Sequence, residues 1–120
     1  IFYCQKVFLY LLHLLLAKRL SILFKKINHS RQILWNSHPL FMLKVDIIKT
    51  ISNLSFWRKH FQTLFKDALI LVLDNCLVDD FNPYIRETSL FCIRNLTKEN
   101  LENQKVIDML EAKSKPKVYL

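Results

Sequence analysis

The sequence predicts an all-α fold, and two features carry this prediction. None of the 120 residues is glycine, whereas an average chain of this length has about eight. Because tight β-hairpins rely on glycine or asparagine at their turns, an all-β fold is disfavoured. Apolar residues recur instead at helical spacing along most of the chain. The lack of glycine also excludes a dinucleotide-binding loop, a P-loop and a G-x-S-x-G nucleophile elbow.

The first half of the chain divides at polar breaks. His38-Pro39 marks a helix start, because proline is favoured at the first helical position. We expect Trp35 and Trp57 to pack inside the protein, or to anchor an interface if they are exposed. In chain order, the predicted elements are one long helix or two short ones at 3–26, a polar break at 28–30, a turn at 32–35, a helix from 38 to about 57, a corner at 58–60 and a short helix at 61–65.

The second half has stronger boundary signals. Asn82-Pro83 combines a capping side chain with proline at the first helical position, and Asp67 can cap the preceding helix. In chain order, the predicted elements are a helix at 68–76, a loop at 78–81, a helix at 83–98, and a last helix that opens at Asn100 or Leu101 and ends before Ser114. The expected buried positions of the last two helices are Ile85, Leu90, Ile93, Leu96, Val106, Ile107 and Leu110.

The chain also aligns with itself when it is shifted by 42 residues. The shift superposes the pairs Ile51/Ile93, Asn53/Asn95, Leu54/Leu96, Gln62/Gln104, Leu43/Ile85 and Ile48/Leu90. A period of this length built from short and long helices is typical of armadillo and HEAT arrays, whose units stack into an α-solenoid. We therefore expect a degenerate N-terminal repeat at 1–39, an armadillo-like domain at 40–112 and a loose C-terminal tail at 113–120.

A set of polar positions carries a family resemblance. They are Asp74-Asn75-Cys76, Asp79-Asp80, Asn82-Pro83-Tyr84-Ile85, Glu87 and Arg94-Asn95-Leu96-Thr97, with 47–54 and Asn103-Gln104 fitting the same pattern. Through them, residues 40–112 resemble the C-terminal armadillo-like domain of the ataxin-10 family. The chain departs from the usual glycines of that family at Ser52 and in the turn at 65–68. The resemblance implies a cytoplasmic, non-enzymatic interaction or scaffold protein, linked in animals to cell division and neuronal maintenance.

Asn53 and Asn95 are the candidate partner-binding pair. In peptide-binding armadillo proteins the third helix of each repeat lines the concave face, where an asparagine can bond the backbone of an extended peptide through both its donor and its acceptor. Lys49 and Phe91 stand one turn before the two asparagines, and Lys49 with Arg94 would favour an acidic peptide. The alternative is structural, with each asparagine tying down its own helix end or the neighbouring loop.

The remaining residues suggest no catalytic or metal chemistry. No nucleophile, base and orienting group form a recognisable motif, so we expect no enzyme activity, no cofactor and no small-molecule substrate. Cys4, Cys76 and Cys92 fit neither a disulfide framework nor a zinc site, which indicates a reducing compartment. We expect Cys92 to be buried. Asp79-Asp80 has no third carboxylate nearby, so we expect no metal site there.

The N-terminal apolar run raises the question of a membrane. Val7–Ala17 contains 11 residues, whereas spanning a bilayer takes about 20. A longer span over 7–24 would bury Lys18 and Arg19 in the bilayer. We therefore favour a buried helix, or a helix that awaits partner repeats, and keep a membrane-associated helix as the alternative. Uncapped repeats expose apolar surface, so self-association is also expected.

The charge distribution leaves a second alternative. Residues 1–66 carry 11 Lys and Arg against Asp46, a net charge of +10, and residues 67–120 carry 7 against 9 acids, a net charge of −2. The basic half could attract nucleic acid. No aromatic and basic motif of the RNA-binding type accompanies it. A solvated basic face is the interpretation that we favour.

Overall fold

The computed structural model describes residues 2–28, 40–77 and 82–114, and this part of the chain is all-α. The predicted turn at 32–35, the helix start at His38-Pro39, Trp35, the pair Asp79-Asp80 and the end of the tail lie outside these residues. The helices are α1 (Phe2–Asn28), α2 (Phe41–Ser55), α3 (Lys59–Leu64), α4 (Lys66–Leu77), α5 (Pro83–Thr97) and α6 (Leu101–Ser114).

Most of the predicted boundaries agree with these helices to within a few residues, but α3 begins at Lys59 inside the expected corner, α6 includes Ser114, and one predicted cap is wrong. The N-terminal segment forms one long helix, and the Asn82 side chain caps α5 by accepting from the Tyr84 N–H at 2.8 Å. Asp67 was expected to cap the following helix, but α4 begins at Lys66, so Asp67 lies in its first turn. The reason is that α3 ends at Leu64 and α4 follows almost directly, which leaves no room for a separate cap.

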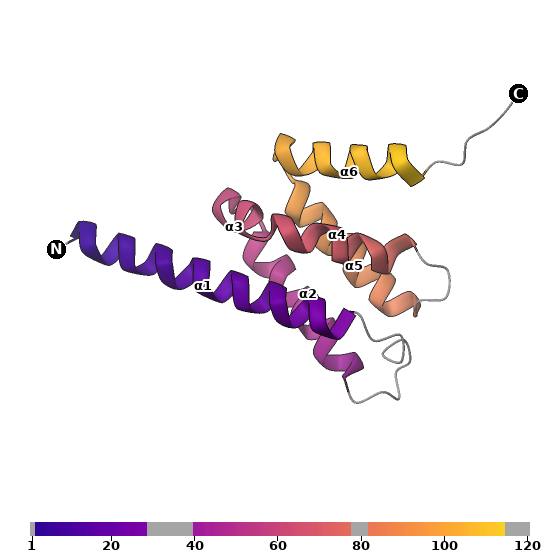
Figure 1. Cartoon of the computed structure of the whole chain (residues 1–120), viewed down its shortest axis with the longest axis horizontal. Coiled ribbons are helices and arrows are strands. Elements are labelled where there is room, and N and C mark those ends of the chain that lie inside the picture. Colours follow the sequence, from indigo (N-terminus) through magenta and orange to yellow (C-terminus); the bar gives the residue numbers. More distant parts are fainter. Residues whose placement is uncertain (1, 29–39, 78–81, 115–120) are drawn as a thin grey trace, which may run out of the picture.

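The helices form two layers, as Figure 1 shows. Helices α1 and α4 run in the same direction in one layer, and α2 and α5 run the opposite way in the other. Helix α5 packs against both α2 and α4, and α1 packs against α2, α3 and α4. The short α3 joins the layers, and α6 packs against α4 and α5. Each pair of long helices, α1 with α2 and α4 with α5, thus repeats the same two-layer arrangement.

The apolar core lies between the two layers. It contains Phe24 of α1, Ile48 and Ile51 of α2, Phe65 at the α3–α4 junction and Cys92 of α5, all of which are fully buried. The predicted burial of Cys92 is confirmed. These residues join α1, α2, α4 and α5 in one hydrophobic cluster, and Leu20, Val106 and Ile107 pack against it.

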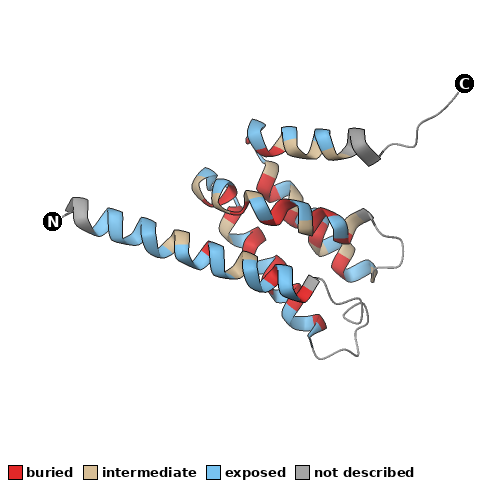
Figure 2. Ribbon diagram, in the orientation of Figure 1, coloured by how far each residue is buried: buried red, intermediate tan, exposed pale blue. Residues whose placement is uncertain are grey.

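The expectation of a buried N-terminal helix is wrong for the first half of α1. The helix extends beyond the rest of the protein, and Figure 2 shows it exposed along this part. Phe8 is 66% exposed, and Leu11 and Leu15 are also exposed. The C-terminal half of α1 supplies Ala17, Phe24 and Ile27 to the core. The cause is geometric, because a 27-residue helix is longer than the helices against which it packs.

The 42-residue repeat recurs in the backbone. Trp57 follows the end of α2 and Glu99 follows the end of α5, and both have left-handed backbone angles, with φ of 57° and 51°. This is the position at which a helix usually ends with glycine, and the chain contains none. The hydrogen bond from the Lys44 N–H to the Leu40 carbonyl recurs from Arg86 to Asn82, at 3.0 and 3.1 Å. The repeat therefore includes the helix starts and ends as well as the apolar spacing.

Two pairs of equivalent repeat positions in α2 and α5 differ in which member is buried. Ile48 is 0% exposed whereas its equivalent, Leu90, is 53% exposed, so the prediction that Leu90 is buried is wrong. At the other pair the order is reversed, with Leu43 40% exposed and Ile85 1% exposed. Among the described helices, α2 packs against α1, α3 and α5 whereas α5 packs against α2, α3, α4 and α6, so equivalent positions have different neighbours. Leu90 lies on a side of α5 that the described helices leave exposed.

Candidate partner-binding face

The candidate residues lie along the contact between α2 and α5, which we call the α2–α5 seam. It contains the exposed residues Lys49 and Asn53 of α2, Tyr84, Phe91 and Arg94 of α5, and Trp57 and Lys98 just beyond the two helix ends. Four of the five predicted site residues, Lys49, Asn53, Phe91 and Arg94, are exposed here. All four belong to the two helices whose contact defines the seam, and Lys49 reaches across it to Tyr84.

One end of the seam is closed by a contact between Lys49 and Tyr84. The Lys49 ammonium donates to the Tyr84 hydroxyl at 2.5 Å and lies 5.1 Å from the centre of its ring. The hydrogen bond to Tyr84 raises the pKa of Lys49, and the nearby Asp46 carboxylate contributes in the same direction. Lys49 therefore stays positively charged at neutral pH, and its position is fixed by an aromatic side chain that the sequence did not reveal.

The middle of the seam combines an aromatic ring with an amide and a guanidinium. Phe91 follows Tyr84 by seven residues, so the two rings lie on the same side of α5. Asn53 follows Lys49 by four residues and likewise shares its side of α2. Phe91 is 57% exposed, so its ring is accessible to a partner.

Asn95 does not reach this surface. Its side chain is buried, and its amide nitrogen donates to the carbonyl and to the hydroxyl of Ser52 at 3.1 and 2.8 Å. The bonds hold α5 to α2, in line with the structural alternative to a binding role. The equivalent residue, Asn53, is exposed because α2 has no equivalent helix on its corresponding side within the described residues. The hydrogen bonds to Ser52 give Asn95 a structural role, and a binding role for it stays a prediction.

The other end of the seam is formed by Trp57 and Lys98. The Lys98 ammonium lies 5.0 Å from the centre of the Trp57 ring, within the range of a cation–π contact. Trp57 is exposed, so its expected packing inside the protein is wrong and the stated alternative of an interface residue remains. The signal that could have identified this end is the repeat itself, because Trp57 and Glu99 are matching positions after equivalent helices.

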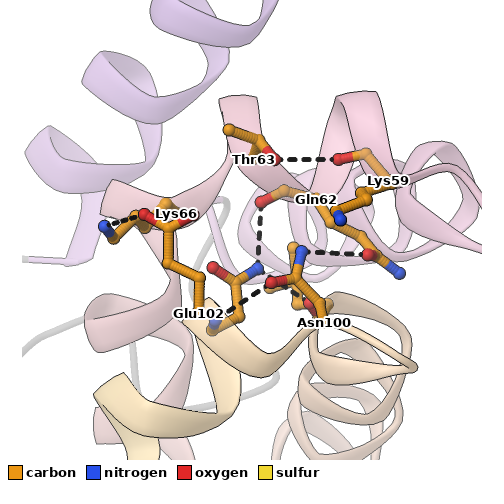
Figure 3. Close-up of polar contacts among 8 residues, drawn as sticks. Lys59, Gln62, Thr63, Lys66, Asn100 and Glu102 are labelled. Carbon is orange, nitrogen blue, oxygen red and sulfur yellow. Dashed lines mark hydrogen bonds and ion pairs between the residues drawn. The ribbon is translucent and has the colours of Figure 1, made fainter.

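A cluster of buried side-chain amides lies beneath this end of the seam. Gln62 accepts a hydrogen bond from Asn100 at 3.1 Å, a contact drawn in Figure 3, and donates to the carbonyls of Asn95 and Lys98 at 2.9 and 3.1 Å. Asn103 donates to the carbonyl of Leu96 at 2.8 Å. The amides thus satisfy the last carbonyls of α5, which have no partner within the helix.

The repeat also accounts for part of this cluster. Gln62 donates to the carbonyl of Ser55 at 3.3 Å, and the equivalent Gln104 donates to the carbonyl of Thr97 at 2.8 Å. The alignment of the two glutamines was visible in the sequence, but their role was not. In a chain without glycine at these helix ends, side-chain amides from the following corner satisfy the free carbonyls.

The ion pair in Figure 3 is a surface feature. Lys66 contacts Glu102 at 2.6 Å, and both side chains are well exposed. The hydrogen bond and charge of Lys66 lower the pKa of Glu102. Exposed pairs of this kind contribute little to stability, so the buried amides rather than the ion pair hold α6 in place.

Nucleophile and metal chemistry have little support in the described residues. Burial raises the pKa of the Cys76 thiol to about 11 and raises that of Cys92 further. Both sulfurs are therefore protonated at neutral pH and poor nucleophiles. In residues 2–28, 40–77 and 82–114, no group of three His, Cys, Asp or Glu side chains could hold a metal ion.

Comparison with known proteins identifies relatives. The sequence profile described as the Spinocerebellar ataxia type 10 protein domain matches residues 43–118. The chain is 38% identical over 77 residues to ataxin-10 of Xenopus tropicalis, covering 62% of this chain and 16% of that protein. It is 35% identical over 95 residues to the ataxin-10 homolog of Kluyveromyces lactis, covering 78% and 17%, and 37% identical over 70 residues to ataxin-10 of Homo sapiens, covering 57% and 15%. No solved structure matches the chain significantly.

Proposed function

The chain belongs to the ataxin-10 family, and from this membership and the α2–α5 seam we propose that it is a non-catalytic, armadillo-like module that binds a protein partner. It spans about a sixth of the length of its curated relatives, with 16% and 17% of the first two covered. The observation that carries the proposal is the seam itself. Two repeat-related helices lie side by side and leave aromatic and basic side chains exposed between them.

The chemistry of the seam suits an extended acidic peptide. Lys49, Arg94 and Lys98 are exposed cations, and exposed aromatic rings such as Phe91 are the residue type that most often anchors an interface. The exposed amide of Asn53 can donate to and accept from a peptide backbone. We propose that carboxylates of the partner meet the cations while an apolar side chain covers Phe91.

The stacking of the repeats supports an α-solenoid arrangement. Backbone features recur after 42 residues, and equivalent positions of α2 and α5 differ in burial with their neighbours. Both observations are expected when one structural unit is repeated along the chain and stacks on the next. As a scaffold of this family, the module would act in the cytoplasm, and a role in cell division is the cellular setting that we propose for it. Exposed apolar side chains such as Phe8 and Leu90 would also allow self-association, which we propose as a further property.

The test is a pull-down that compares matched variants of the chain. Phe91→Ala and Arg94→Glu remove the ring and reverse one charge on the seam, and both side chains are exposed, so the fold should survive. Lys105→Glu makes the same charge change on exposed α6, away from the seam. Asn53→Ala tests the exposed asparagine by itself, because Asn95 also holds α5 to α2 and its substitution would disturb that contact.

The expected result is that a specific partner is lost with Phe91→Ala and Arg94→Glu and kept with Lys105→Glu. Circular dichroism of each variant must show unchanged helix content. If the seam variants stay folded and keep every partner that the unchanged chain binds, the proposal is wrong. If Lys105→Glu loses the partner as well, the attraction is general charge rather than the seam.

A membrane-associated role is the second candidate, and the exposed surface of α1 is the observation that favours it. Gln5–Ile27 is long and apolar enough to cross a membrane by length and composition, and 11% of its most apolar window is buried. Core helices and signal sequences meet the same criteria, and Lys18 and Arg19 lie within the segment. Carbonate extraction separates the two roles, since release into the soluble fraction would exclude an integral membrane helix.

A further inference from the structure

A groove opens between α1 and α4, in the layer opposite the α2–α5 seam. Its volume is about 490 Å³. Lys18, Ser21, Ile22 and Lys25 of α1 form one wall, and Asp67 and Ile70 of α4 face them. Leu64 and Leu71 complete a largely apolar lining. The groove therefore combines an apolar surface with charges at its edge.

The charges along the α1 wall are positive and regularly spaced. Lys18 and Lys25 are both exposed and are seven residues apart, which places them on the same side of the helix about 10 Å apart along its axis. Across the groove, Asp67 forms no ion pair with either lysine among the described residues. Both ammonium groups are thus available to a ligand that carries negative charge.

The apolar part of the α1 wall continues beyond the groove. Leu11 and Leu15 precede Lys18 by seven and three residues, and both are exposed, so helical spacing puts them on the same side of α1 as Lys18 and Ile22. In addition, the Ser21 oxygen is buried and has no hydrogen-bond partner in the described part of the chain. The surface from Leu11 to Lys25 spans about 20 Å at the helical rise.

We propose that this groove binds an amphipathic helix of a partner protein whose acidic residues are seven positions apart. The two carboxylates would meet Lys18 and Lys25, since both spacings equal two helical turns. Apolar side chains between them would cover Ile22 and Ile70, and further ones would follow Leu15 and Leu11. Asp67 makes the lining mixed in charge, which favours a peptide over the uniformly negative surface of an anionic membrane. This second site does not depend on the α2–α5 seam.

The probe is a labelled helical peptide with glutamates at two positions seven apart and leucines at the two positions midway between them. Because this pattern is unchanged when the helix is reversed, the peptide can bind in either direction. A second peptide carries lysines in place of the two glutamates. The double variant Lys18→Glu/Lys25→Glu reverses the groove charges of the full chain. The control is Arg19→Glu/Lys26→Glu, a neighbouring exposed pair with the same spacing, outside the groove lining.

Fluorescence anisotropy should show that Lys18→Glu/Lys25→Glu weakens binding of the glutamate peptide by about tenfold or more and allows the lysine peptide to bind. The Arg19→Glu/Lys26→Glu control should change affinity less than about threefold at physiological salt, where exposed charges are screened. Ile70→Asp should weaken the glutamate peptide as well, because it removes apolar contact from the groove, and circular dichroism should show each variant folded.

Three outcomes would overturn the proposal. Equal effects of the two charge-reversal pairs would mean non-specific attraction to a basic helix. Failure of the glutamate peptide to bind the unchanged chain would remove the helix as the ligand. Binding of phosphatidylserine vesicles that requires Lys18 and Lys25, without peptide binding, would assign the groove to a membrane surface instead.

Discussion

Replacing Gln62 with methionine tests the idea that buried amides hold the two repeats together. Methionine has a similar volume and a flexible side chain, so Gln62→Met removes the polar groups with little change in packing. Gln62 is 2% exposed, and water therefore cannot replace the lost hydrogen bonds without opening the core. The substitution isolates the contribution of the amide.

The expected loss of stability can be worked out from three hydrogen bonds. The substitution leaves the Asn100 amide without its acceptor, and it removes the donors to the carbonyls of Asn95 and Lys98. The bond to Ser55 is the longest of those that the Gln62 amide nitrogen makes, at 3.3 Å, and adds little. Because an unpaired buried group costs about 1–3 kcal/mol, and the Lys98 carbonyl is partly reached by water, we expect a loss of about 3–5 kcal/mol.

The assay is urea denaturation followed by circular dichroism, with Gln104→Met as the matched control. Within the described part of the chain, the Gln104 side chain makes one hydrogen bond, to the partly buried Thr97 carbonyl, so its substitution should cost about 1 kcal/mol. In the Gln62→Met background, Asn100→Leu should cost less than it does alone, because its acceptor is already missing. Equal losses at Gln62 and Gln104, or additive effects of Gln62→Met and Asn100→Leu, would refute the reasoning.

Three further predictions concern single residues. Asn95→Ala should lower the free energy of unfolding by about 1–3 kcal/mol, because it breaks the contact between α5 and α2. Asn53→Ala, at an exposed residue, should change it by less than about 0.5 kcal/mol in the same urea titration. Similar losses for the two variants would contradict the burial of Asn95. Glu99→Gly should raise the melting temperature, because glycine adopts the left-handed backbone at φ 51° without strain. Trp57→Gly should raise it less, because that substitution also removes the contact with Lys98. An unchanged melting temperature for Glu99→Gly would argue against strain at this position. Burial lowers the pKa of Lys44 from 10.5 to about 8, so the unfolded chain binds more protons between these values and stability should rise by up to about 3 kcal/mol from pH 8 to 10.5. The rise should disappear in Lys44→Met, and its persistence there would assign it to another group.

The sequence predicted the parts of the fold that local chemistry determines. Asn82 and Pro83 start α5 as expected, because a capping side chain and a preset backbone angle act within one turn. The repeat was also visible, since equivalent residues such as Gln62 and Gln104 serve equivalent helix ends. Lys49 and Arg94 are exposed, as is usual for charged residues, whereas Lys44 of α2 is buried.

The features that the sequence did not predict depend on which neighbours are present. Apolar residues in α1 look the same whether or not another helix covers them, so the exposure of Phe8 could not be read from its type. Asn95 and Asn53 occupy the same repeat position, yet one contacts Ser52 and the other faces solvent. Trp57 was expected inside, but it lies in a left-handed backbone after α2, is exposed, and has the Lys98 ammonium over its ring.

Two pairs of equivalent residues in α2 and α5 illustrate how burial depends on the neighbouring helices. At these two pairs of positions, the apolar residue is buried in one helix and exposed in the other. Ile48 and Ile85 form the inner sides of the two helices, while their equivalents, Leu90 and Leu43, form the outer sides. The exposed outer sides are therefore chemically similar to the surfaces that are buried between helices inside the chain. Both candidate binding sites lie between helices of successive repeats, the seam in one layer and the groove in the other. A surface that is built by stacking two units exists only when both are in place, so the binding properties of this chain follow from its repeat and not from any single helix.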